Sequence, residues 1–239
     1  MILQARCVCW HYPASDSRCS VDSLMPLKIE LAQSNHIAPS ERFLDLPENK
    51  RPTTFLPKAK SVIVIGSQLF EVLTKKLSVQ KKIGEVSFRD FYNAHNETVI
   101  NDLKQTGYRL ARFLTNKGYP SINIGQDLTD YRTITSAFSF KYAAVQAGLG
   151  IIGKNGLVLT PAYGPRIKLS VVISEAPLEG DNIAVEDLCD DCEICIKVCP
   201  SGALKEPVGD SRPNYDRFVC CSFYTANEGC GLCMGKCPR

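Results

Sequence analysis

Apolar residues in the first three quarters of the chain alternate between strand-like runs and helix-like spacings. Residues 61–66 form an apolar run that is rich in β-branched side chains and ends in glycine, which predicts a buried strand. Apolar residues recur at helical spacing over 101–117, just before another glycine, and they predict a helix. A short strand over 122–124 and a helix over 138–147 follow from the same reasoning.

Two further apolar runs, 157–160 and 167–173, are separated by a turn rich in proline and glycine. We expect them to form a pair of strands across that turn. Residues 25–34 are expected to begin with a helical stretch, and residues 176–186 read as a polar linker. Strands and helices therefore alternate up to this linker, as in an α/β (α+β) fold.

The composition is that of a globular protein with a small appended module. The chain has 239 residues, of which 44% are hydrophobic, and this is enough for one core. We predict an irregular leader over 1–24, an α/β cofactor-binding domain over 25–184 and a cysteine-rich module over 185–239. No apolar run is long enough to span a membrane, and a net charge of +3 predicts no nucleic-acid partner.

The module contains the pattern C-x-x-C-x-x-C-x-x-x-C-P and, further on, a partial repeat of it. The cysteines are Cys189, Cys192, Cys195 and Cys199 in the first run and Cys230, Cys233 and Cys237 in the second. In bacterial two-cluster modules the fourth cysteine of such a run ligates the other cluster. We therefore predict two 4Fe-4S clusters in a ferredoxin-like module. The first cluster would be bound by Cys189, Cys192, Cys195 and Cys237.

The second cluster would take Cys199, Cys230, Cys233 and one further ligand. The position three residues before Cys230 is Asn227, so the extra thiol has to come from further upstream. Cys220 and Cys221 are adjacent there, and neighbouring side chains in an extended segment point in opposite directions. We favour Cys220, with Cys221 as the alternative.

Zinc sites and disulfides also use C-x-x-C pairs. Zinc takes four ligands and would leave too many thiols unexplained, and disulfides need an oxidising compartment. The first ten residues lack the apolar core of a secretory signal, so we expect a cytoplasmic protein. Cys7, Cys9 and Cys19 fit no standard cluster spacing, and we predict no third cluster there.

A glycine-rich loop precedes the module. Gly148, Gly150 and Gly153 match the letters of a dinucleotide-binding motif, but here a helix precedes the loop and a strand follows it, which is the reverse of that fold. We interpret the glycines as allowing close approach of the backbone to a bound group, to which Lys154 and Asn155 add a charge and an amide. The alternative is simple helix-to-strand packing with Lys154 in solvent.

The run A-A-x-x-A-G-L-G-x-x-G-K-N-G at 143–156, the T-P-x-Y-G at 160–164 and the double cysteine pattern resemble the family of epoxyqueuosine reductases and reductive dehalogenases. R-P-T at 51–53 and L-P-x-A-K-S-V at 56–62 extend the likeness, which covers about residues 25–239. The resemblance implies a nitroreductase-like domain that binds cobalamin beside a two-cluster ferredoxin domain. It also implies that the loop from Gly148 to Asn155 lines the corrin and that a small molecule is reduced.

The likeness fails at one place. Epoxyqueuosine reductases carry an acid in a V-D-x-A-P stretch, and the same position here is Ile134, in the run T-I-T-S-A. Opening an epoxide needs a positioned acid, so this departure speaks against that substrate. Asp127, Asp130 and Tyr131 are nearby in sequence and are candidates to supply the acid instead, with Asp130 and Tyr131 kept as candidate catalytic residues; the alternative interpretation is an exposed turn. By resemblance to dehalogenases, Tyr131 or Tyr142 is a candidate proton donor.

We therefore interpret the chain as a cytoplasmic iron–sulfur oxidoreductase that passes electrons from a donor such as a ferredoxin or flavodoxin, through two 4Fe-4S clusters, to a corrinoid. Two alternatives stay open. The first is a non-catalytic electron carrier or corrinoid-reducing activator, for which a missing acid is expected. The second is an iron–sulfur reductase that holds a flavin in its α/β domain.

Overall fold

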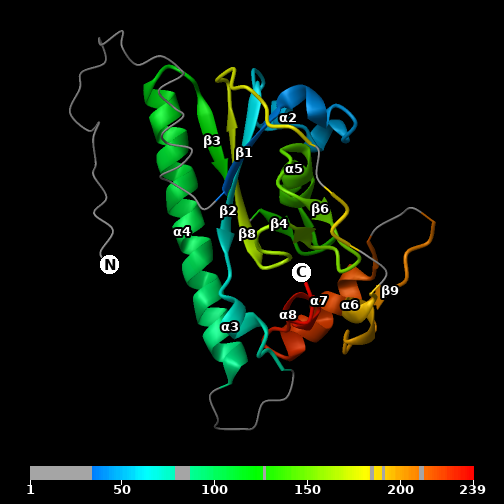
Figure 1. The fold of residues 1–239 in the computed structure, drawn as a ribbon. Coiled ribbons are helices and arrows are strands. Elements are labelled where there is room, and N and C mark those ends of the chain that lie inside the picture. Colours follow the sequence, from blue (N-terminus) through cyan, green and yellow to red (C-terminus); the bar gives the residue numbers. More distant parts are fainter. Residues whose placement is uncertain (1–33, 79–86, 126–127, 184–185, 190–191, 210–212) are drawn as a thin grey trace.

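A four-stranded antiparallel sheet forms the centre of the protein in a computed structural model (Figure 1). The structure describes residues 34–78, 87–125, 128–183, 186–189, 192–209 and 213–239. The strand order is β1-β2-β8-β3, and each neighbouring pair is antiparallel. The strands are β1 (Ser34–Pro39), β2 (Ser61–Gln68), β8 (Ile167–Ser174) and β3 (Ser121–Ile124).

The two central strands are buried on both faces because both are almost continuously apolar. Side chains alternate along β2, so that Val62 and Val64 join the core on one face while Ile63 and Ile65 join the core on the other. The predicted strand over 61–66 is therefore confirmed and extends by two residues.

The long helix α4 (Phe88–Asn116) covers one face of the sheet (Figure 1). It begins at a capping box, in which the backbone N–H of Ser87 donates to the Asp90 carboxylate at 2.7 Å. It ends before Gly118, whose φ of 88° is the left-handed conformation that favours glycine. The predicted helix over 101–117 is confirmed, but it begins earlier, at Phe88. Asparagine and histidine residues hide the apolar spacing in that first half.

Shorter helices cover the opposite face. They are the single-turn elements η2 (Ser40–Phe43), η3 (Glu48–Lys50) and α2 (Pro52–Phe55), together with α5 (Phe140–Gln146). Phe43 and Phe138 are fully buried here, with ring centroids 5.8 Å apart. Aromatic packing therefore fixes α5, which leads directly into the glycine-rich loop.

Two small two-stranded ribbons follow β3 along the chain. The first is β4 (Thr129–Asp130) with β5 (Thr135–Ser136), and the second is β6 (Ile151–Ile152) with β7 (Val158–Leu159). The expected pairing of 157–160 with 167–173 is wrong. Residues of β7 pair with β6 because Gly156, at φ 70°, allows the chain to fold straight back, whereas β8 is held between β2 and β3.

The cysteine-rich module lies at one end of the sheet domain, beside α3 (Glu71–Thr74) and the start of α4 (Figure 1). It contains α6 (Ile194–Lys197), β9 (Leu204–Lys205), β10 (Asn214–Tyr215), α7 (Arg217–Ala226) and α8 (Leu232–Gly235). The mixed helix and strand content is thus as predicted. The leader over 1–24 lies outside the described residues, as does the expected helical stretch over 25–34 except for Ser34, which begins β1.

Candidate metal centre

The two cysteine runs fold into matching local structures. Cys192 and Cys230 are each followed by a residue in the left-handed conformation, Glu193 at φ 49° and Gly231 at φ 98°. A single-turn helix comes next in both runs, α6 in the first and α8 in the second, and the two helices contact each other. The left-handed residue turns the chain sharply, so that the C-x-x-C thiols are presented around one side of a tight loop.

Four thiols from both runs line one pocket. They are Cys189, Cys192, Cys195 and Cys237, and we call them the first thiol group. Lys154, Leu159 and Arg239 also line this pocket. Burial, and then the charges of Cys189, Cys192 and Cys237, raise the pKa of Cys195 to about 11. The first run thus meets the last cysteine of the second run.

Five described thiols remain, and four of them, Cys199, Cys220, Cys230 and Cys233, are the ligands expected for the second cluster; we call these four the second thiol group. Burial raises the pKa of Cys233 to about 12, and the next largest contributions come from the charges of Cys230 and Cys220. Burial likewise raises the pKa of Cys220, with Cys199 and Cys230 as the strongest neighbouring charges. The four thiols are therefore coupled electrostatically, and Cys233 is also coupled to Cys195 of the first thiol group.

The chemistry of both groups fits iron–sulfur clusters. Each group offers four thiolate donors, which is the ligand set of a 4Fe-4S cluster, and each draws on both runs as a crossed two-cluster module does. None of the nine cysteines within residues 186–189, 192–209 and 213–239 is in a disulfide. In the same part of the chain, no three metal-ligating side chains lie close enough together to hold a single metal ion.

Cys220 and Cys221 lie on the helix α7, and the expectation that this segment is extended is wrong. Asp216 caps α7 by accepting hydrogen bonds from the backbone N–H groups of Phe218 and Val219 at 2.9 and 3.1 Å, so the chain enters a helix before it reaches the two cysteines. Adjacent helical side chains still differ in direction by about 100°. On a helix, as on an extended segment, the two thiols face different directions. One of them is therefore still expected to be the ligand of the second cluster, and the other not.

The glycine-rich loop is packed against the chain itself. A Cβ atom on Gly150 would overlap the Leu159 carbonyl oxygen, and one on Gly148 would overlap the Asn182 carbonyl oxygen. A helix precedes the loop and a strand follows, as expected. However, the backbone that approaches these glycines is the protein's own. Close approach to a flat macrocycle is thus not needed to explain the glycines, and the loop forms no cradle for a corrin at these positions.

Lys154 and Asn155 lie at the first thiol group instead of in solvent. Their exposed fractions are 6% and 8%, and both line the thiol pocket. The backbone N–H of Lys154 donates to Cys189 Sγ at 3.3 Å, and the Asn155 side-chain amide donates to the Cys233 carbonyl at 3.4 Å. The alternative that placed Lys154 in solvent is wrong, because β6 and β7 carry this turn beneath the module.

No motif in the sequence marks Lys141, which lies beside the second thiol group. Its ammonium donates to the Gly156 carbonyl at 2.6 Å and lies 5.9 Å from the centre of the Tyr215 ring. Burial lowers its pKa, while the charges of Cys233 and Cys220 act in the opposite direction. A lysine in an amphipathic helix reads as a surface residue until the fold places it against the module.

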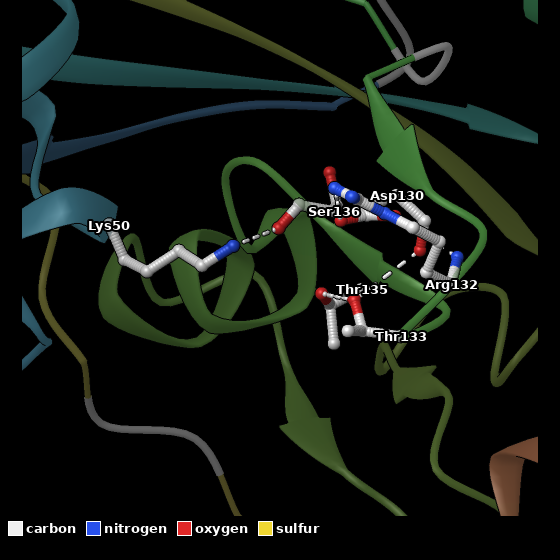
Figure 2. A network of polar contacts seen from close by, with 6 residues as sticks. All are labelled: Lys50, Asp130, Arg132, Thr133, Thr135 and Ser136. Carbon is white, nitrogen blue, oxygen red and sulfur yellow. Dashed lines mark hydrogen bonds and ion pairs between the residues drawn. The ribbon is translucent and has the colours of Figure 1, made fainter.

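The candidate proton donors Asp130 and Tyr131 lie in the β4–β5 ribbon. Figure 2 shows Arg132 paired with the Asp130 carboxylate. Arg132 Nε donates to Asp130 Oδ1 at 3.0 Å, and Nη2 donates to Oδ2 at 2.9 Å. This contact lowers the pKa of Asp130, so the carboxylate is ionised at neutral pH and holds no proton to give. Tyr131 is 78% exposed, as an exposed turn predicts. The other carboxylate considered, Asp127, lies outside the described residues.

The turn of this ribbon contains Ile134, where the resemblance described above led us to look for an acid. Its φ of 50° is in the left-handed region, which is rare for a β-branched residue. The ribbon is held from both sides. Lys50 donates to the Ser136 carbonyl at 2.5 Å (Figure 2), and Arg217 of α7 donates to the Thr133 carbonyl at 3.5 Å.

The third candidate donor, Tyr142, is on α5. Its hydroxyl donates to the Asp45 carboxylate, and its ring packs edge-on against Phe43 at 5.8 Å. Burial and then the Asp45 contact raise the pKa of Tyr142 to about 12. The phenol is therefore neutral and its proton is shared with a carboxylate, in a place apart from the ribbon that carries Asp130.

Known proteins resemble this chain in two ways. Residues 183–205 match the family described as a 4Fe-4S binding domain. An epoxyqueuosine reductase of Bacillus subtilis is 28% identical over 212 residues, which cover 81% of this chain and 51% of that protein. The chain thus spans about half the length of the curated relatives it matches. Within the described residues no helix is long and apolar enough to cross a membrane.

Solved structures share the fold. An epoxyqueuosine reductase in complex with an epoxyqueuosine-modified tRNA stem loop has a TM-score of 0.60, 21% identity, and coverage of 91% of this chain and 64% of that one. A reductive dehalogenase whose structure suggests a mechanism for B12-dependent dehalogenation has a TM-score of 0.65 and 19% identity, covering 87% and 30%. The resemblance predicted from the sequence is therefore confirmed: the chain is related to epoxyqueuosine reductases and reductive dehalogenases, and it contains a 4Fe-4S binding domain.

Proposed function

We propose that this protein is an iron–sulfur reductase with two 4Fe-4S clusters, one held by the first thiol group and one by the second. The observation that carries the proposal is the crossing of the two cysteine runs. Cys237 joins the three leading thiols of the first run around one pocket, and Cys199 joins the thiols of the second run. Two groups of four thiolates match the ligand requirement of two cubane clusters.

When bound, each cluster supplies a site that gains and loses one electron. The chain's own residues set the surroundings of that site. Cys192 and Cys220 are exposed, so each thiol group has one member at the surface, where an electron donor such as a ferredoxin or flavodoxin could dock. Lys154 and Asn155 cover the side of the first thiol group that faces the sheet domain.

We propose that the electron acceptor is a corrinoid. This proposal rests on the likeness to the reductive dehalogenase whose structure suggests a mechanism for B12-dependent dehalogenation. The packing of Gly148 and Gly150 against the protein's own backbone offers the macrocycle no contact in that loop. We therefore assign no corrin-binding role to these glycines. A nitroreductase-like architecture and a small-molecule substrate also belong to the proposal, with a flavin as the alternative cofactor.

The state of the candidate proton donors favours a second function, that of an electron carrier or corrinoid-reducing activator. Asp130 is ionised against Arg132, Tyr131 stands in solvent, and Tyr142 already donates to Asp45. These three side chains do not form one acid site. An activator needs no proton donor, because its partner performs the chemistry.

Metal analysis of anaerobically prepared protein tests the clusters. We expect about eight irons and eight acid-labile sulfides per chain. Cys192→Ala should lose about half of the iron, because the first thiol group loses one ligand while the second stays complete. Cys221→Ser is the matched control and should keep all of it. Iron near zero, with one or two zinc ions in its place, would overturn the proposal.

Titration of the cluster-loaded protein with hydroxocobalamin tests the acceptor. Retention of cobalt with a change in the corrin absorption bands supports a corrinoid. Retention of flavin without cobalt moves the flavin alternative to first place. Retention of neither, with both clusters intact, favours the electron carrier.

A further inference from the structure

The backbone N–H of Lys154 is not used by the turn that contains it. Residues 153–156 join β6 to β7 in a four-residue turn, in which the Gly156 N–H donates to the Gly153 carbonyl at 2.8 Å. Such a turn leaves the N–H groups of its two middle residues available to other acceptors. Neither middle residue, Lys154 or Asn155, has a positive φ, and Gly156 follows them at φ 70°, as in a type I turn that ends in a glycine bulge.

This N–H donates to a thiol of the first thiol group. The acceptor is Cys189 Sγ, at 3.3 Å, and both residues line the thiol pocket. The chain around Cys189 has contacts of its own. The Cys189 N–H donates to the Asp187 carboxylate at 2.9 Å, and the Leu188 carbonyl accepts from Arg239 Nε at 3.1 Å. The N–H of Lys154 thus reaches from the sheet domain to a thiol that the module itself holds in place.

Asn155 holds the turn against the module. Its side-chain oxygen accepts from the Leu157 N–H at 3.0 Å, and its side-chain amide donates to the Cys233 carbonyl at 3.4 Å. Lys154 and Asn155 are both buried, so this side of the pocket is shielded from water. A hydrogen bond in such surroundings is electrostatically stronger than the same bond in water.

We propose that Lys154 raises the reduction potential of the cluster at the first thiol group, because its backbone N–H donates a hydrogen bond to the ligand sulfur of Cys189. The inference rests on the proposed function, since it requires that cluster. Reduction adds one electron from an external donor such as a ferredoxin or flavodoxin, breaks no bond and moves no proton. The added electron makes the sulfurs more negative, so a hydrogen-bond donor stabilises the reduced cluster more than the oxidised one.

Potentiometric titration with dithionite and mediators, followed by EPR, measures both cluster potentials in the full chain. Lys154→Pro removes the N–H, and proline is favoured at the second residue of a type I turn. Lys154→Ala is the matched control, because both variants lose the lysine side chain but only Lys154→Pro loses the N–H. We expect reduction of the first cluster to be about tenfold less favourable in Lys154→Pro than in Lys154→Ala, which for one electron is a potential about 59 mV lower. The second cluster, identified as the one that Cys192→Ala retains, should differ much less.

Selective labelling tests the hydrogen bond without altering the turn. Protein is prepared with lysine that carries ¹⁵N at its backbone nitrogen. Pulsed EPR of the reduced wild type should then show a ¹⁵N hyperfine coupling that is missing in Lys154→Ala, whose alanine is unlabelled. A wild-type spectrum with no coupling from Lys154 overturns the proposal.

The result separates failure of this inference from failure of the proposed function. Wild-type protein without two 4Fe-4S signals refutes the proposed function itself. Two normal clusters, with a first-cluster potential in Lys154→Pro equal to or above that in Lys154→Ala, refute only the role of Lys154. If Lys154→Pro does not assemble its clusters, Asn155→Ala and the labelling decide, because Asn155 holds the turn in place. A wild-type potential in Asn155→Ala then overturns the proposal, and a lowered one, together with the ¹⁵N coupling in wild type, supports it.

Discussion

Cys220 and Cys221 are neighbours on α7, and Cys220 is coupled electrostatically to thiols of the second thiol group. The charges of Cys199 and Cys230 raise its pKa after burial does, and its own charge acts on Cys233. We expect Cys220→Ser to lose up to half of the iron, because the second cluster then lacks a thiolate. Cys221→Ser should keep the wild-type amount. Iron and sulfide analysis of both variants checks this, and full iron in Cys220→Ser would show that Cys220 is not the fourth ligand.

Tyr142 should ionise well above the ordinary tyrosine range, because burial and the Asp45 carboxylate both favour the neutral phenol. Its pKa is raised from 10.0 to about 12. A raised pKa stabilises the folded state fully below pH 10, and that contribution is lost as the pH rises toward 12. Rapid pH jumps, with phenolate absorbance compared between wild type and Tyr142→Phe, measure the shift. Asp45→Asn should lower the pKa, and ionisation near pH 10 in wild type would contradict the prediction.

At the scale of elements, the sequence predicts those whose own residues carry a strong signal. The run at β2 is apolar on both faces, and α5 has regular helical spacing, so both were predictable. The strand β1 was not, because S-N-H-I-A-P has few apolar residues and gains its burial only by pairing with β2. The pairing of β7 with β6 was also not predicted. The expected partner, β8, pairs with β2 instead, and the residues of β7 themselves do not indicate this.

The β6–β7 ribbon makes the role of its glycine testable. Gly150→Ala places a methyl group against the Leu159 carbonyl oxygen, which cannot move without distorting the ribbon. We expect a loss of about 1–3 kcal/mol in the free energy of unfolding, and we expect it even in protein without clusters or corrinoid. Gly153→Ala is the matched control: its methyl group meets the movable end of the Leu159 side chain and should cost less. Unchanged stability of cofactor-free Gly150→Ala in thermal unfolding would instead favour a role in cofactor contact.

At the scale of the whole molecule, the cysteine spacing predicts two crossed clusters, because ligand geometry is encoded in short intervals along the chain. The surroundings of the clusters were not predictable. Lys154 lies outside the module in sequence, and the fold buries it beside the thiols of the first group. The docking of the module against the sheet domain also joins Asn93 of α4 to the Glu228 carbonyl at 2.9 Å and Lys236 to the Lys75 carbonyl at 3.4 Å.

Removal of the clusters should therefore unfold the module while the sheet domain persists. The sheet has an apolar core on each face, whereas α7 has no buried residue, so metal ligation has to supply much of the module's folding energy. After anaerobic chelation of iron, we expect hydrogen exchange to accelerate over residues 186–239 and to stay slow in β2 and β8. The short helix α3 should lose protection together with the module, because α8 packs against it. Equal acceleration in β8 would show that the two parts unfold as one cooperative unit, and slow exchange throughout would show that the module holds its fold without metal.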